Sequence, residues 1–184
     1  ACIGGAAGGS VGSITISDAE LPLLSSEKVL IGWDADSPGG KLTIRNCRVE
    51  STDIPTTHTD GIRVGSNSEI VIENGEIRLP HLRGIRVGGN GSIAIRDSDL
   101  HTYGIFMDET VQSPNDAKTL KKLEITDSIV LTGDIIGARG EYSSVEEIVI
   151  RGSSIRLNDE YTYNRCTIGG GEKASFGSID IQNS

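Results

Sequence analysis

Two arginines occupy the same place in two similar segments of the chain. Arg63 and Arg86 each lie third in a Gly-Ile-Arg-Val tetrapeptide. A guanidinium group can grip a carboxylate through two parallel hydrogen bonds, as in a uronic acid, and an aromatic ring can pack on the face of a sugar. Trp33, the only tryptophan, and Phe106 lie near the equivalent positions of neighbouring segments. These four residues form the candidate binding site, and an extended acidic carbohydrate is the ligand that suits them.

The same residues allow a purely structural interpretation. Like charges stacked about 5 Å apart disfavour each other unless an anion or a carboxylate lies between them. A loop acid such as Asp60 could supply that carboxylate, and Trp33 could fold over its own loop. Both interpretations remain open from the sequence.

Other acidic residues suggest metal binding or catalysis more weakly. Asp34-Ala-Asp36-Ser-Pro-Gly-Gly alternates carboxylates and ends in glycines, which is typical of a calcium turn, although the distal glutamate of the helix-loop-helix calcium motif is missing. Asp108 or Glu109, facing Asp34 or Asp36, could form the carboxylate pair that glycoside hydrolysis uses. The spacing compels neither arrangement, so calcium is the only cofactor suggested and no catalytic residue is assigned.

A repeat predicts how the chain positions these residues. Seven segments share an aliphatic residue followed two places later by isoleucine, which is the period of a strand with one buried face. The segments are Ser13–Leu21, Lys41–Val49, Glu69–Ile77, Ser92–Leu100, Lys122–Val130, Glu147–Ile155 and Ser178–Ser184. The first aliphatic residues are Ile14, Leu42, Ile70, Ile93, Leu123, Ile148 and Ile179, and isoleucine fills the second position in all seven. A repeat of this kind predicts an all-β fold, a parallel β-helix (β-solenoid) of about seven coils.

Each predicted strand is followed by a predicted corner. The fourth residue after the first aliphatic one is always Asp, Asn or Gly, which tolerate a left-handed backbone: Asp18, Asn46, Asn74, Asp97, Asp127, Gly152 and Asn183. The next residue is small and is expected to face inward: Ala19, Cys47, Gly75, Ser98, Ser128 and Ser153.

A second aligned set precedes the repeat segments. We align the pairs Ile3-Gly4, Ile31-Gly32, Val64-Gly65, Val87-Gly88, Met107-Asp108, Ile136-Gly137 and Ile168-Gly169 as one column of an additional strand. With the strands on either side of the corner, this gives three short strands in each coil.

Composition and charge limit the partners. The chain has 17 Lys and Arg against 26 Asp and Glu, a net charge of −9, which argues against nucleic acid. No run approaches the roughly 18 apolar residues of a membrane-spanning helix. On the predicted outer faces, charges alternate in sign from coil to coil, as in Arg45, Glu73 and Arg96, in Glu20, Arg48 and Glu76, and in Glu50, Arg78 and His101.

The three cysteines are predicted to be free thiols. Cys2 and Cys166 fall at nearly equivalent positions in the first and last coils, about 29 Å apart at roughly 4.8 Å per coil. A disulfide needs Cα atoms within about 7 Å, so these two cannot pair within one chain. Cys47 belongs to the small inward column, where cysteine packs as a compact apolar residue.

Segments 3–21, 31–51 and 168–184 resemble the Ile-Gly-Gly repeats of bacterial surface and secreted β-helix proteins. Segment 59–79 resembles the Asp-Gly-Ile repeats of polysaccharide-binding modules in the pectate-lyase-like superfamily. This resemblance implies a right-handed winding and a secreted or cell-surface location. The catalytic cluster of the lyases has no residue-by-residue counterpart here.

We therefore expect one β-helix domain over residues 1–184, excised from a longer chain. Its expected role is a non-catalytic, adhesin-like module that binds acidic polysaccharide or a cell-surface glycan. A polysaccharide lyase or glycoside hydrolase and a structural spacer or fibre segment are the alternatives. Neither end of the sequence offers a polar cap, which makes end-to-end or lateral self-association a further expectation.

Overall fold

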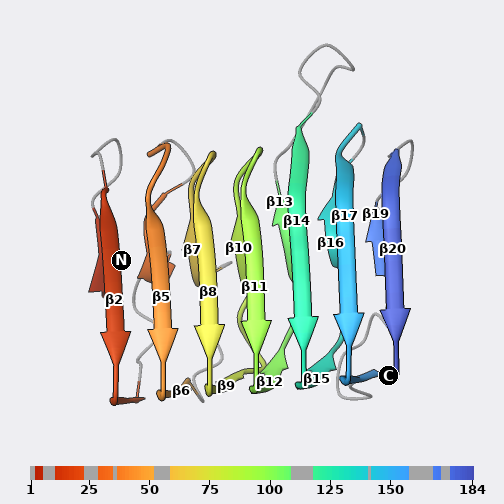
Figure 1. The fold of residues 1–184 in the computed structure, drawn as a ribbon. Coiled ribbons are helices and arrows are strands. Elements are labelled where there is room, and N and C mark those ends of the chain that lie inside the picture. The colour runs from red at the N-terminus through yellow and green to blue at the C-terminus, as the bar shows by residue number, and fades with distance from the viewer. Residues whose placement is uncertain are drawn as a thin grey trace.

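The fold is a parallel β-solenoid, as the repeat predicts (Figure 1). The computed structural model describes residues 3–5, 11–22, 29–34, 37–51, 59–108, 118–140, 142–157, 168–170 and 175–184. In these residues all regular secondary structure is β-strand, every strand pairing is parallel, and the strands stack in three sheets. No helix in this part of the chain has the length and apolar character needed to cross a membrane.

The three sheets contain seven, seven and six of the described strands. Sheet A is formed by β1 (Ile3–Gly4), β4 (Val29–Gly32), β7 (Asp60–Val64), β10 (Ile85–Val87), β13 (Ile105–Asp108), β16 (Ile136–Arg139) and β19 (Ile168–Gly170). Sheet B is formed by β2 (Ser13–Ser17), β5 (Lys41–Arg45), β8 (Glu69–Glu73), β11 (Ser92–Arg96), β14 (Thr119–Thr126), β17 (Ser144–Arg151) and β20 (Phe176–Gln182). Sheet C is formed by β3 (Glu20–Pro22), β6 (Arg48–Glu50), β9 (Glu76–Leu79), β12 (Asp99–Thr102), β15 (Ile129–Thr132) and β18 (Ser154–Leu157).

Sheet B confirms the predicted isoleucine columns. Ile14 pairs with Leu42 and Ile16 pairs with Ile44, and this register continues strand by strand to β20. From β5 to β17 the side chains of both columns are at most 1% exposed. A shift of one residue would turn every one of these side chains to solvent, so burial of one face fixes the register.

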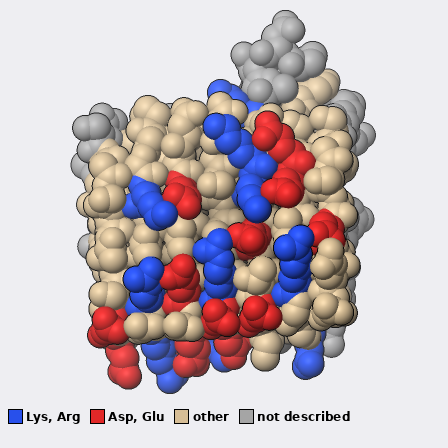
Figure 2. Space-filling view, viewed as in Figure 1, with Lys and Arg blue, Asp and Glu red and all other residues tan. Residues whose placement is uncertain are grey.

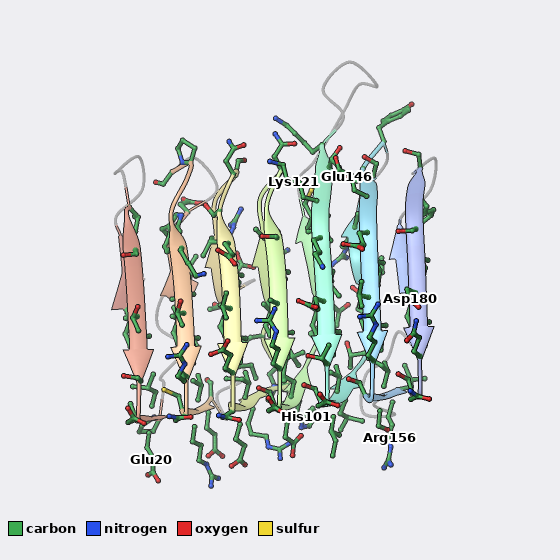
Figure 3. All side chains as sticks on the ribbon, viewed as in Figure 1. Glu20, His101, Lys121, Glu146, Arg156 and Asp180 are labelled. Carbon is green, nitrogen blue, oxygen red and sulfur yellow. The ribbon has the colours of Figure 1, made fainter. Side chains whose placement is uncertain are left out.

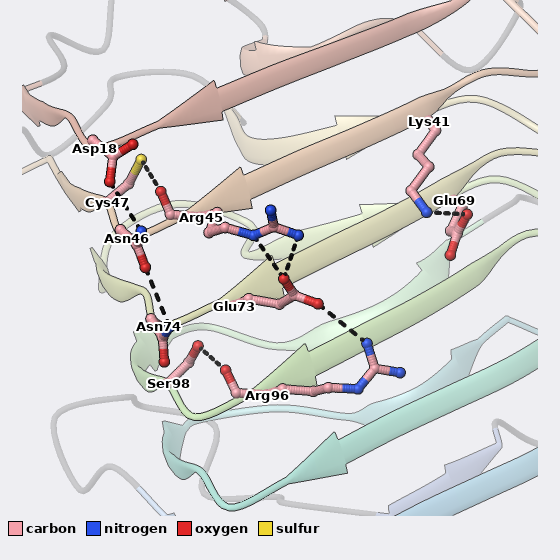
Figure 4. Close-up of polar contacts among 10 residues, drawn as sticks. All are labelled: Asp18, Lys41, Arg45, Asn46, Cys47, Glu69, Glu73, Asn74, Arg96 and Ser98. Atoms are coloured by element: carbon pink, nitrogen blue, oxygen red, sulfur yellow. Dashed lines mark hydrogen bonds and ion pairs between the residues drawn. The ribbon is translucent and has the colours of Figure 1, made fainter.

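The predicted corners are also confirmed. All seven corner residues have a left-handed backbone, with φ between 48° and 58°. Asn46 Nδ2 donates to Asp18 Oδ1 at 2.9 Å, and Asn74 Nδ2 donates to Asn46 Oδ1 at 3.2 Å (Figure 4). The corner side chains therefore link successive coils in addition to the backbone bonds of the corner residues, such as that from the Asn46 N–H to the Glu73 carbonyl oxygen at 3.0 Å.

Serine hydroxyl groups form hydrogen bonds with backbone N–H and C=O groups at the residue that follows the corner. Ser98 and Ser128 each donate to the carbonyl two residues earlier, at 2.6 and 2.7 Å, and each accepts a backbone N–H from the preceding coil at 3.0–3.1 Å. Cys47 occupies the same column, with its Sγ 3.1 Å from the Arg45 carbonyl oxygen. The predicted free, buried thiol of Cys47 is confirmed, whereas Cys2 and Cys166 lie outside the described residues.

The alignment predicted for sheet A is wrong by two residues in the middle of the stack. Ile31 pairs with Ile62, and Gly32 pairs with Arg63, so Val64 and Gly65 do not belong to the column of Ile31 and Gly32. The same shift applies to the next two strands, where the partners in this column are Ile85 and Ile105. A strand repeats every two residues, so inward aliphatic positions two apart could not be distinguished by alternation alone.

Charged side chains pair across the outer faces, and Figure 2 shows positive and negative side chains alternating over sheet B. Glu73 lies between two arginines, with Arg45 Nη2 at 2.7 Å and Arg96 Nη1 at 3.6 Å. In sheet C the expected stacking of Glu20, Arg48 and Glu76 is present in the register. These are exposed pairs worth about 0–1 kcal/mol each, so they stabilise the stack modestly.

Candidate functional site

The predicted arginine stack exists on the outer side of sheet A. Arg63 in β7 pairs in register with Arg86 in β10, and Phe106 in β13 follows in the same column. Ile62 and Ile85, one residue earlier, face the core at 0% exposure, and the alternation of the strand turns the arginines outward. The sheet thus brings three of the four candidate residues into one line.

A buried carboxylate lies between the two arginines. Arg63 Nη1 donates to Asp60 Oδ2 at 2.9 Å, and Arg86 Nη1 donates to the other oxygen, Asp60 Oδ1. The Asp60 side chain is 4% exposed, and Asp34 Oδ1 lies 3.6 Å from Arg63 Nη1. The acid that the structural interpretation required is therefore present, and it belongs to the chain itself.

The charge of Arg86 depends on this carboxylate. Burial lowers the pKa of the Arg86 guanidinium, and Arg63 and Arg83 lower it further by repulsion. The charge of Asp60 and its hydrogen bond act in the opposite direction. Asp60 thus compensates the cost of placing a cation where water cannot solvate it.

Phe106 is fully buried between two guanidinium groups. The Arg86 Cζ atom lies 5.7 Å from the centre of the ring, and the Arg139 Cζ atom lies 5.6 Å from it. The ring also packs over Gly104, where an added Cβ would come within 2.7 Å of it. At 0% exposure, Phe106 offers no face to a sugar and acts instead as a cation–π partner.

Trp33 lies on the opposite side of the sheet from the arginines. The shifted register places it one residue beyond the Gly32–Arg63 pair, level with the inward-facing Val64. Trp33 is 0% exposed and belongs to the hydrophobic core. The structure therefore groups Arg63, Arg86 and Phe106 and separates Trp33 from them.

The acidic candidates are only partly described. Asp34 is in an ion pair with Arg63, whereas Asp36, the Asp108 side chain and Glu109 lie outside the described part of the structure. Among the residues that are described, no group of three or more His, Cys, Asp or Glu side chains is arranged to hold a metal ion. The calcium turn at Asp34 and Asp36 stays a prediction.

Two members of the site were missed from the sequence. Arg139 contacts Phe106, and its Nη1 lies 3.3 Å from Asp134 Oδ2. Burial raises the pKa of Asp134, while Arg139 and the backbone N–H of Ile135 lower it. Because Arg139 lies two residues after Gly137, which pairs with Phe106, the strand alternation would have predicted its place once the register was right. We call Arg63, Arg86 and Arg139, with Asp60, Phe106 and Asp134, the arginine cluster.

The arginine cluster on sheet A exposes cations, whereas a depression at a different part of the surface exposes acidic side chains. The Arg63 side chain is 21% exposed and that of Arg139 is 43% exposed. A shallow, open depression of ≈ 510 Å³ lies along the corner between sheets B and C, and its lining includes Asp97, Asp99 and Asp127. An anionic ligand would be attracted to the arginine cluster and repelled from the corner.

A scan of the chain against protein-family models found no match, and neither the curated proteins nor the solved structures yielded a significant one.

Proposed function

We propose that the chain is a non-catalytic, adhesin-like module of a secreted or cell-surface protein, in which the β-solenoid is a rigid structural segment. The observation that carries this proposal is the internal pairing of the groups that could bind a ligand. Arg63 and Arg86 share the buried Asp60, and Glu73 joins the arginines of the coils on either side of it. Because the charged side chains of neighbouring coils pair with one another, this surface suits a rigid spacer better than it suits a ligand-binding site.

We further propose that the solenoid winds right-handed and belongs with the Ile-Gly-Gly repeat proteins of the pectate-lyase-like superfamily. Parallel strands in three sheets, with an aliphatic column and a left-handed corner residue in each described coil, support this assignment. The lyase or hydrolase alternative needs Asp34, Asp36, Asp108 and Glu109 to converge. Asp34 forms an ion pair with Arg63, an arrangement that does not favour a catalytic carboxylate.

Incubation with polygalacturonate and alginate, with and without calcium, tests the non-catalytic assignment. We expect no unsaturated uronide by absorbance and no new reducing ends, while the protein stays folded by circular dichroism. Product formation that falls in an Asp34→Asn variant would overturn the proposal in favour of an enzyme.

The arginine cluster supports a second candidate function, the binding of an acidic polysaccharide. Arg63 and Arg139 remain partly exposed on the same face, on either side of the buried Arg86 and Phe106. Two uronates of one polysaccharide chain could each reach one of these guanidinium groups, which lie on strands three spacings of roughly 4.8 Å apart. At Arg63 the uronate would compete with the half-exposed Asp34.

Affinity electrophoresis through gels containing polygalacturonate separates specific binding from general attraction. The variant Arg63→Gln/Arg139→Gln should lose retardation, and the matched variant Arg45→Gln/Arg151→Gln should keep it. Both variants lose two positive charges, and the control arginines are exposed on sheet B. Equal loss in both variants, or a wild-type chain that is not retarded, would reject the second candidate.

A further inference from the structure

The sequence contains two Asn-Gly dipeptides, and the fold places them at two different corners. Asn74-Gly75 forms the corner between sheets B and C, and Asn90-Gly91 forms the corner between sheets A and B. These corners lie at opposite ends of the sheet B strands. In Figure 3, Lys121 marks the end beside the Asn90 turn, and His101, in the strand next to β9, marks the end beside the Asn74 corner.

The two dipeptides share their local environment in three respects. Both asparagines are exposed, and both have a left-handed backbone, with φ 48° at Asn74 and 59° at Asn90. Both glycines, Gly75 and Gly91, are buried. A difference in reactivity between the two sites would therefore come from the hydrogen bonds that hold them.

An Asn-Gly dipeptide can lose ammonia through a reaction with its own backbone. The glycine nitrogen, after giving its proton to hydroxide, attacks Cγ of the asparagine, the bond from Cγ to Nδ2 breaks, and ammonia leaves with a proton taken from water. Water then adds to either carbonyl of the resulting cyclic imide, and the ring opens to aspartate or isoaspartate. Glycine favours the attack because no Cβ obstructs its nitrogen and its backbone rotates freely. The reaction requires that the asparagine side chain and the glycine N–H both leave their hydrogen bonds.

Both reacting groups of the first dipeptide are bonded to neighbouring coils. Asn74 Nδ2 donates to Asn46 Oδ1 at 3.2 Å, and the Gly75 N–H donates to Ser98 Oγ in the next coil at 3.0 Å. The Ser98 hydroxyl is held in place by its own hydrogen bond to the Arg96 carbonyl oxygen at 2.6 Å. An attack at Asn74 would have to break one bond to each adjacent coil.

The second dipeptide is held more weakly. In the described part of the chain the Asn90 side chain has no hydrogen bond, and the Gly91 N–H donates across its own turn to the Gly88 carbonyl oxygen at 3.2 Å. The turn contains two further glycines, Gly88 and Gly89, so it can open without disturbing the stack. The side chain of Lys118 packs on Gly89, where an added Cβ would lie 2.9 Å from its Cδ. A cationic side chain beside the turn favours the deprotonated nitrogen that the reaction needs.

We propose that Asn90 is a site of spontaneous deamidation in the folded chain, and that the hydrogen bonds at the other corner protect Asn74 from the same reaction. The aspartate product keeps the turn, because aspartate tolerates a left-handed backbone. The isoaspartate product lengthens the backbone beside Gly91, where an added Cβ would already come within 2.2 Å of Val87 Cγ2. Modification at Asn90 therefore adds a negative charge and, in the isoaspartate form, loosens the corner between sheets A and B. This inference does not depend on either function proposed above.

Mass spectrometry of tryptic peptides tests the proposal on the 184-residue chain kept folded in mildly alkaline buffer. Cleavage after arginine places Asn74 in peptide 64–78 and Asn90 in peptide 87–96, so the two reactions are followed separately. We expect Asn90 to react at least about ten times faster than Asn74 in the folded chain, and the two rates to become similar in urea. Similar rates in the folded chain, an Asn90 that reacts only in urea, or an equally large difference in urea would each overturn the proposal.

A pair of serine variants tests the protection of Asn74 directly. Ser98→Ala removes the acceptor of the Gly75 N–H and should speed the reaction at Asn74 by about tenfold, with the rate at Asn90 unchanged. Ser128→Ala is the matched control, because Ser128 belongs to the same column but accepts the Ser98 N–H, one coil further on. It should leave Asn74 protected.

An Asn74 rate that does not respond to Ser98→Ala, or that rises equally in both serine variants, would contradict the protective role of this hydrogen bond. Ser98→Cys replaces Ser98→Ala if the alanine variant does not fold, because Cys47 already occupies this column, and its weaker acceptor should give a smaller acceleration. Circular dichroism confirms that every variant compared is folded.

Discussion

Replacing Asp60 with asparagine should destabilise the fold more than any other single loss of charge on the described surface. The change removes the charge that separates Arg63 from Arg86, and with it the buried carboxylate that pairs with the Arg86 side chain, which is 6% exposed. Breaking a buried pair in this way costs about 3–5 kcal/mol. A unit charge interaction of about 4 kcal/mol at 4 Å, with an effective dielectric constant of 20, gives the same size.

Glu73 provides a matched control for this prediction. Its carboxylate also lies between two arginines of neighbouring coils, but Glu73 is 27% exposed and Arg45 and Arg96 are 53% and 40% exposed. Solvent screens these pairs, and Glu73→Gln should cost about 0–1 kcal/mol. The two substitutions remove the same charge from the same arrangement, so the difference between them measures the effect of burial.

Chemical denaturation followed by circular dichroism, with thermal melts in parallel, measures both variants. At about 2–4 °C per kcal/mol for a chain of this size, Asp60→Asn should lower the Tm by about 6–20 °C. The double variant Asp60→Asn/Arg86→Met should recover part of the loss, because it also removes the buried cation whose charge Asp60 compensates. Equal costs for Asp60→Asn and Glu73→Gln, or no recovery in the double variant, would refute the assignment of Asp60 as the charge on which the stack depends.

Three further substitutions test other parts of the structure. Gly137→Ala would place a Cβ 1.8 Å from a backbone oxygen at φ 142° and should cost about 2 kcal/mol or more by denaturation, whereas Gly12→Ala, with nothing within 4 Å, should cost much less. Ser128→Ala removes the acceptor of the Ser98 N–H and should lower the free energy of unfolding by about 1–3 kcal/mol. Ser128→Cys should lower it less, because Cys47 already occupies the same column with its Sγ beside a carbonyl oxygen. Equal losses in the two variants would contradict the role of the column's hydrogen bonds. Burial raises the pKa of Asp134, so its contribution to stability is full below the unfolded value and is lost as pH rises through the folded one. The Tm of Asp134→Asn, measured relative to that of the wild type, should therefore increase as the pH is raised from about 4 to 7. A Tm difference between the two proteins that stays constant over this pH range would contradict the prediction.

Sheet B could be predicted from the sequence because two independent constraints agree there. Alternation fixes which side chains face the core, and the left-handed corner residue fixes where the strand ends. In every repeat segment the second aliphatic residue precedes the corner residue by two positions, as Ile44 precedes Asn46. A register shift of two residues would therefore move the asparagine away from the corner. With both constraints present, the register has one solution.

Sheet A lacked the second constraint. Glycine marks the column in the sequence alignment, but Gly32 is a strand residue at φ 118° that pairs with Arg63, whereas Gly65 follows the end of its strand. The two glycines perform different tasks, and aligning them shifted Trp33 by two residues. Because a strand alternates, a shift of two keeps the facing of every aliphatic residue, and no violated pattern revealed the error.

The stacking of the two arginines could be predicted from the sequence, but the anion that pairs with them could not. Two in-register arginines require an anion, and the sequence does not distinguish a uronate from a carboxylate of the chain itself. The answer depends on where one loop acid lies, and Asp60 reaches both Arg63 and Arg86 from the start of β7. A ligand carboxylate would have to displace a partner already buried, whereas at Arg139 it meets a side chain that is 43% exposed. Any acidic glycan should therefore bind to the partly exposed Arg63 and Arg139 and leave the buried pair of Asp60 and Arg86 unchanged. For this reason the variants at Arg63 and Arg139 test binding, whereas the variant at Asp60 tests folding.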